Sequence, residues 1–131
     1  GDDNFELSIF CRMNDAGDIV IIGAPENDDK DTNAGVIRVY RWNGSSWIKD
    51  NTELYAPTPS NNGRFGAGLE INPTGDIVAG ASNGQISIFQ YYNGDWATIG
   101  SLAADTGPVT NSYSPGYITL YGQFTIGLSE I

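Results

Sequence analysis

The sequence predicts an all-β protein made of antiparallel sheets, and three observations support this. Apolar residues alternate with a period of two in most segments, whereas no segment holds the 3.6-residue period of a helix. Glycine accounts for 17 of the 131 residues, and glycine and asparagine tolerate the positive φ of tight hairpin turns. The pattern of strands and turns also occurs twice, so we expect two similar sheets.

The first half of the chain is expected to form four strands. The first is residues 5–13, whose apolar side chains fall on one face: Phe5, Leu7, Ile9, Cys11 and Met13. Residues 19–22 are a continuous apolar run, typical of a strand buried on both faces. Residues 36–42 alternate again, Asn43-Gly44 is a strong hairpin signal, and Trp47-Ile48 begins the return strand.

The second half repeats these landmarks in the same order. The matches are Gly17-Asp18-Ile19-Val20 with Gly75-Asp76-Ile77-Val78, Gly23-Ala24-Pro25 with Gly80-Ala81-Ser82, 35–40 with 84–89, and Asn43-Gly44 and Trp47 with Asn93-Gly94 and Trp96. The spacing falls from 58 residues at Gly17 and Gly75 to 49 at Trp47 and Trp96, because the acidic loop 26–34 is reduced to Asn83. We therefore expect a first repeat over about 5–54 and a second over about 64–102, each the size of a propeller blade.

The rest of the chain does not continue the repeat. Residues 103–116 read as a linker, and residues 117–131 as one long strand with an apolar face formed by Ile118, Leu120, Phe124, Ile126 and Leu128. Such a strand needs a partner for its backbone and its apolar face, in this chain or in a neighbouring one. We treat 1–131 as a single domain that is too short for a closed propeller, which takes at least four blades.

The two repeats resemble the FG-GAP type of β-propeller repeat found in integrin α-subunit heads. The second copy carries Phe65-Gly66, Gly75-Asp76, Gly80-Ala81, Ile86-x-Ile88-Phe89 and Trp96, and the first carries the corresponding motifs except that Phe5-Glu6 lacks the glycine. The resemblance covers roughly residues 5–100. It implies propeller-like sheets, and it implies little about what the sheets do.

Composition excludes several classes of function. Six Lys and Arg against 16 Asp and Glu give a formal net charge of -10, which does not suit a nucleic-acid binder. The absence of histidine excludes imidazole bases and His-ligated zinc. No apolar run approaches the length of a membrane span. Asp18 and Asp76 occupy equivalent turns and Glu70 stands alone, so no catalytic carboxylate pair is evident, and we expect no enzyme.

The acidic loop is the strongest candidate for a metal site. Asp29, Asp31 and Asn33 place oxygen ligands at alternating positions, as a calcium loop does. Integrin-like repeats carry calcium in a comparable hairpin, and the resemblance supports the assignment to that extent. Gly35 comes one position late for the usual loop and no closing acid follows, so a solvated acidic turn is the alternative, and no other cofactor is expected.

Two surface features complete the candidate sites. Trp42, Tyr91 and Tyr92 lie beside the Asn-Gly turns and could stack on sugars or proteins, whereas we expect the equivalent residues Trp47 and Trp96 to pack in the core. Asn43-Gly44-Ser45 is a glycosylation sequon at an expected hairpin tip. The single cysteine, Cys11, cannot form an internal disulfide; we expect a buried thiol, with an intermolecular link as the alternative.

These patterns predict a non-enzymatic extracellular or cell-surface module that acts through protein–protein contacts. The sharper expectation is self-assembly with copies of itself or with neighbouring repeats, linked into filaments by strands exchanged at the two ends. The alternative is a propeller fragment that binds carbohydrate or a receptor, either with or without calcium. The chain opens without Met on Gly-Asp-Asp-Asn, unlike a signal peptide, and we interpret it as a processed or excerpted segment.

Overall fold

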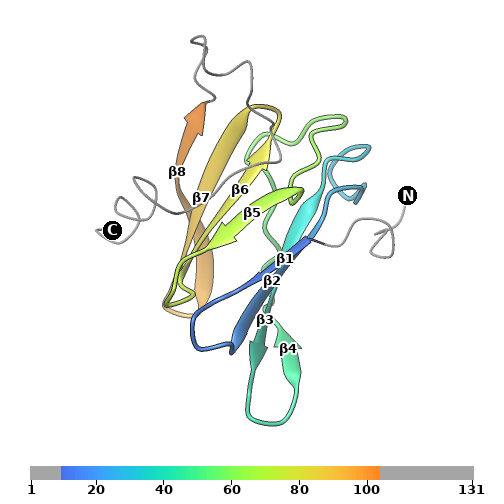
Figure 1. Cartoon of the computed structure of the whole chain (residues 1–131). Coiled ribbons are helices and arrows are strands. Elements are labelled where there is room, and N and C mark those ends of the chain that lie inside the picture. Colours follow the sequence, from blue (N-terminus) through green and yellow to red (C-terminus); the bar gives the residue numbers. More distant parts are fainter. Residues whose placement is uncertain (1–9, 104–131) are drawn as a thin grey trace.

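The computed structural model describes residues 10–103, which form two four-stranded antiparallel sheets (Figure 1). The first sheet has the order β1 (Phe10–Met13), β2 (Ile19–Ala24), β3 (Val36–Trp42) and β4 (Trp47–Lys49). The second has the order β5 (Gly68–Ile71), β6 (Ile77–Ser82), β7 (Gln85–Tyr92) and β8 (Asp95–Ala103). The prediction of an all-β fold is confirmed, and neither sheet closes on itself.

Strand register confirms the duplication and corrects one detail of it. Ile19 pairs with Arg41 and Ala24 with Val36 in the first sheet, whereas Ile77 pairs with Gln90 and Ser82 with Gln85 in the second. Every inner strand therefore repeats with a constant offset, 58 residues for β2 and β6 and 49 for β3 and β7. By this offset Gly23 corresponds to Ala81. The predicted match of Gly23 with Gly80 is therefore wrong by one position, because it aligned identical residues and not residues at equivalent positions in the strand pairing.

Each β1–β2 and β5–β6 turn is organised by one buried asparagine. Asn14 Oδ1 accepts the N–H groups of Asp18 and Ile19, and its Nδ2 donates to the carboxylate of Asp18 at 2.8 Å. Asn72, 58 residues later, makes the corresponding bonds to Ile77 and, at 2.9 Å, to Asp76. The interpretation of Asp18 and Asp76 as turn residues is confirmed.

The main core lies between the two sheets, with Phe65 at its centre. Phe65 is fully buried, and its ring meets the edge of Phe89 at a centroid distance of 5.9 Å. Glycines allow the backbones to approach at this contact: a Cβ on Gly23 would collide with the carbonyl oxygen of Gly66, and one on Gly35 with the backbone of Phe65. The Phe65-Gly66 segment of the second repeat thus docks on glycines of the first.

Two further predictions concern the ends of the chain and its cysteine. Phe5, Leu7 and Ile9 of the first expected strand lie outside the described residues, as do Ile118, Leu120, Phe124, Ile126 and Leu128 of the last. The expectation of a buried Cys11 is wrong, because β1 is an edge strand and the thiol is exposed. Within residues 10–103 there is no helix long and apolar enough to cross a membrane.

Candidate functional site

The three residues of the expected calcium loop each have a different partner. The carboxylate of Asp29 accepts the hydroxyl of Tyr55 at 3.2 Å, Asp31 accepts the backbone N–H of Thr32, and the Asn33 amide donates to Asn62 at 3.0 Å. Asn33 also adopts a positive φ of 52°. Among the described residues, no three carboxylate or cysteine side chains are grouped to hold a metal ion. Calcium at this loop stays a prediction.

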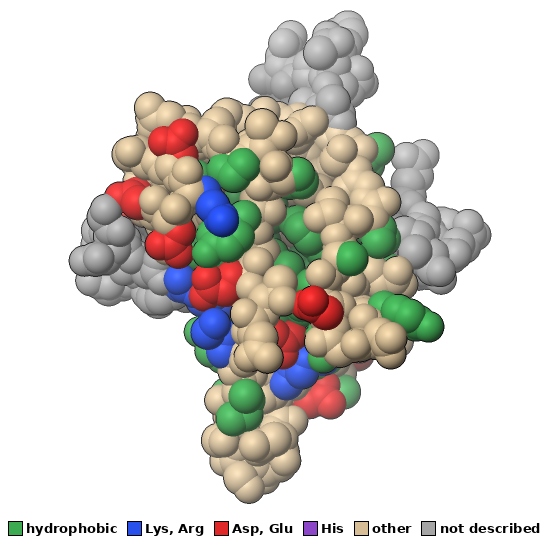
Figure 2. Space-filling view, turned by 180° about the vertical axis from the view of Figure 1, so that it is seen from behind, with side chains coloured by type: hydrophobic (Ala, Val, Ile, Leu, Met, Phe, Trp, Pro, Cys, Tyr) green, Lys and Arg blue, Asp and Glu red, His purple; other side chains and the backbone are tan. Residues whose placement is uncertain are grey.

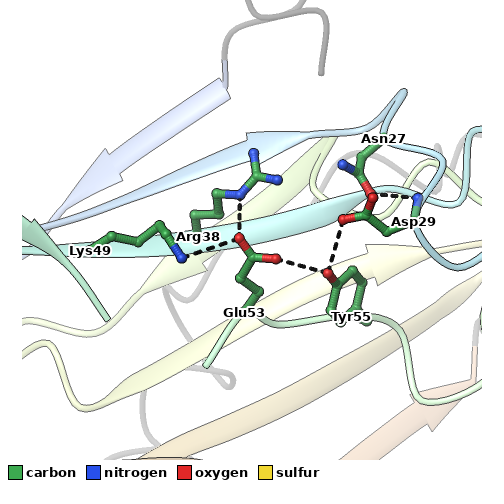
Figure 3. A network of polar contacts seen from close by, with 6 residues as sticks. All are labelled: Asn27, Asp29, Arg38, Lys49, Glu53 and Tyr55. Carbon is green, nitrogen blue, oxygen red and sulfur yellow. Dashed lines mark hydrogen bonds and ion pairs between the residues drawn. The ribbon is translucent and has the colours of Figure 1, made fainter. Parts of the chain in front are cut away.

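A polar network beside this loop is centred on Glu53 (Figure 3). Its carboxylate accepts hydrogen bonds from Arg38 at 2.7 Å, Tyr55 at 2.8 Å and Lys49 at 3.3 Å. Burial opposes ionisation of Glu53, but these three donors and the charge of Arg38 outweigh it and lower its pKa to about 2. Burial and the carboxylates of Glu53 and Asp29 raise the pKa of the Tyr55 phenol, so this hydroxyl stays a donor.

Replacing Glu53 with glutamine is expected to lower the free energy of unfolding by about 2 kcal/mol at pH 7. The pKa of Glu53 is lowered on folding, so its contribution is complete above its ordinary value of 4.5 and is lost as the pH falls toward 2. Urea unfolding at pH 7 and pH 3 measures this, and the variant should differ less from the wild type at pH 3. Asp15→Asn, in an exposed turn, is the control. Equal losses at both pH values would contradict the assignment.

A second cluster joins the two sheets through an aromatic pair. Tyr91 and Trp96 of the second sheet lie 5.2 Å apart at an interplanar angle of 57°. The guanidinium of Arg41 sits 3.8 Å above the Tyr91 ring, and the indole N–H of Trp96 donates to Asp50 at 2.9 Å. Arg41 and Asp50 are themselves paired at 2.9 Å. Arg41 Nη2 is buried with no hydrogen-bond partner in the described part, and the ring face is its neighbour instead.

The equivalent pair in the first sheet is exposed. Trp42 and Trp47 lie 5.4 Å apart at 55°, and their side chains are 43% and 42% exposed. The expectation that Trp47 and Trp96 both pack in the core is therefore correct for Trp96, at 7% exposure, and wrong for Trp47. The physical reason is that the first sheet covers Trp96, whereas the opposite face of the first sheet has no third sheet on it within residues 10–103.

The other two predicted positions are at hairpin tips. Asn43 is exposed, and its side-chain oxygen accepts the N–H groups of Ser45 and Ser46. Tyr92, beside the Asn93-Gly94 turn, is 77% exposed. Both are accessible to a modifying enzyme or a ligand, whereas Tyr91 is half-buried under Arg41.

A cavity of about 510 Å³ opens between the two sheets, beside the Glu53 network. It is lined by the connection from Thr52 to Pro59, by Lys30, and by Phe89, Trp96 and Thr98 of the second sheet. Figure 2 shows one face of the molecule. Charged side chains gather on the left and lower part of that face, and hydrophobic side chains lie among them. Glu53 is the carboxylate in the lining, and its three donors keep it ionised.

The edge of the second sheet was missed by the sequence patterns. β8 is nine residues long, against three in the equivalent β4, and within the described part it pairs only with β7. Ile99 and Leu102 are 37% and 50% exposed on it. Its composition gave the available signal, since residues 96–103 contain neither a charge nor a proline.

Searches against protein-family models, curated proteins and solved structures find no match to this chain.

Proposed function

We propose that the chain is a non-enzymatic structural or adhesive module that assembles with copies of itself outside the cell. The observation that carries the proposal is the long, largely uncharged edge that β8 presents within residues 10–103. Natural proteins shorten, charge or bend the edge strands of their sheets, because a long apolar edge recruits strands from other chains. β8 has nine residues, exposed Ile99 and Leu102, and a charge only at Asp95; one register shift, which leaves Ile99 unpaired between Thr98 and Gly100, is the irregularity along it.

The hairpin before β8 fixes which of its amides face outward. Asn93 and Gly94 have φ values of 59° and 87°, as a two-residue type I′ turn requires. The closing pair Tyr92–Asp95 then exchanges both hydrogen bonds, and alternate pairs do the same as far as Thr98, after which the register shifts and Ile99 has no partner on β7. The N–H groups of Trp96 and Thr98 accordingly point away from β7. That of Trp96 donates to the Asp95 carboxylate at 2.8 Å, so the N–H of Thr98 is the one that a strand from another chain would bind.

The sheets are proposed to be two FG-GAP-type blades, and the docking of Phe65-Gly66 on Gly23 and Gly35 supports this. An extracellular or cell-surface location is supported by the exposed sequon at Asn43.

The absence of enzymatic activity is supported by the carboxylates: Glu53 is held ionised by its three donors. Burial raises the pKa of Glu70, and the neighbouring charge of Arg12 opposes this rise. Glu70 and Arg12 lie 3.6 Å apart, and neither residue lines the cavity.

Thr98→Pro is expected to abolish self-assembly and leave the fold intact. Proline removes an N–H that faces outward, so the β7–β8 ladder keeps its own hydrogen bonds. Light scattering over a range of concentrations should show the wild type growing into larger species and the variant remaining a monomer. Thr98→Val keeps the N–H and serves as the matched control. Assembly that persists in Thr98→Pro, or a wild type that is monomeric throughout, would refute the proposal.

A further inference from the structure

The exposed Trp42–Trp47 pair and the covered Tyr91–Trp96 pair are the same structural feature in two environments. Both members are related by the 49-residue offset that relates β3 to β7. The two pairs have nearly the same geometry, 5.4 Å and 55° against 5.2 Å and 57°. The groups that contact the Tyr91–Trp96 pair thus show which kind of side chain can bind to such an aromatic pair.

The covered pair is occupied by a paired arginine and aspartate from the neighbouring sheet. The Arg41 guanidinium lies on the ring face of Tyr91, where the negative face of the π-system attracts a cation. The carboxylate of Asp50 accepts the indole N–H of Trp96. Branched aliphatic residues of the same sheet, Ile37 and Val39, are fully buried beside them.

The first sheet offers the same groups without an occupant among the described residues. Trp42 and Trp47 are each more than two-fifths exposed, and Met13, which pairs with Val20 on this face, is 53% exposed. Lys49 lies two residues from Trp47 on the same face of β4, where its ammonium is 3.3 Å from Glu53 and its side chain is 41% exposed. A carboxylate that accepted the Trp47 indole N–H, as Asp50 accepts that of Trp96, would lie near this ammonium and share it with Glu53.

We infer that the Trp42–Trp47 face docks a second, different protein whose β-sheet presents an arginine paired with a carboxylate. A second copy of this chain fits less well, because its own Arg41 and Asp50 are already bound to Tyr91 and Trp96. Its second sheet carries Gln90 at the position equivalent to Arg41. This docking face lies on the first sheet and does not depend on strand addition at β8.

A cyclised hairpin of residues 36–50 tests the inference as a probe of this chemistry. It carries Ile37, Val39, Arg41 and Asp50, with Trp42→Thr and Trp47→Thr so that it cannot supply the ring pair itself. Titrated into the full chain, it should shift the indole N–H resonances of Trp42 and Trp47 in a saturable manner. Trp42→Ala and Trp47→Ala should each weaken binding at least about tenfold, and an Arg41→Gln probe should lose as much.

Two controls separate this surface from the rest of the chain. Tyr92→Ala removes an exposed ring outside the pair and should leave the affinity unchanged. Thr98→Pro should also bind the probe as the wild type does, so that failure of the β8 proposal is told apart from failure of this one. The inference is overturned if the indole signals do not move, if the Arg41→Gln probe binds equally well, or if neutral oligosaccharides displace the probe. Self-association of the chain that Trp42→Ala abolishes would assign the face to a second copy and overturn it equally.

Discussion

Replacing Phe65 with alanine is expected to lower the free energy of unfolding by about 3–5 kcal/mol, the range for a large aromatic side chain removed from a core. Phe65 is fully buried between the sheets and touches Phe89 edge to face at 5.9 Å. Its ring also fills the space above Gly80 that a side chain there would occupy. This loss of stability has two parts. The variant no longer gains the free energy of burying the ring, and the substitution leaves a cavity that the two docked sheets cannot close.

Chemical denaturation monitored by circular dichroism measures this effect. Tyr92→Ala is the control, because its ring is 77% exposed and its removal should change stability by less than about 0.5 kcal/mol. A loss below about 1 kcal/mol in Phe65→Ala would mean that the sheets are not docked through this ring.

Gly23→Val is expected to separate the two sheets, at a cost of about 3 kcal/mol or more. A Cβ at Gly23 would overlap the carbonyl oxygen of Gly66 and press on the Leu69 side chain. The carbonyl belongs to the backbone and cannot rotate away, so the sheets must move apart and expose the core around Phe65. Fluorescence of Trp96, buried at this interface, should shift to longer wavelength.

Gly100→Val is the matched control for this change. Gly100 also lies in a strand, β8, but a Cβ there would meet no atom within 4 Å. Its replacement should leave the Trp96 emission and the unfolding midpoint close to those of the wild type. Equal effects of the two substitutions would show that general strand propensity, and not the close approach at Gly23, is responsible.

The sequence was sufficient to predict the sheets because their signals are local. Alternation along β3 and β7, the Asn43-Gly44 and Asn93-Gly94 turns and the repeated Gly-Asp turns are each contained in a few neighbouring residues. The duplication strengthened these predictions, because the same assignment of strands and turns had to fit both repeats. The one-residue error at Gly80 arose where two small residues follow one another and only cross-strand pairing distinguishes them.

The environment of each site could not be predicted, because it depends on contacts between the sheets. Trp47 and Trp96 are equivalent in sequence, yet one is exposed and the other covered by Arg41 and its neighbours. Glu53 and Arg38 lie 15 residues apart and meet only because the connection after β4 runs back along β3. The position of β8 at an edge, within the part of the chain that the structure describes, is likewise a property of the assembled sheet.

The central claim, that β8 accepts a strand from another chain, is tested most directly by amide exchange at Thr98. In the isolated molecule its N–H faces outward from β7, so it should exchange rapidly in dilute solution, whereas the inward N–H of Ala97 should be protected. At high concentration the Thr98 amide should become protected as assembly proceeds. Protection of Thr98 that is already complete in the dilute monomer, or its absence at every concentration, would contradict strand addition between chains.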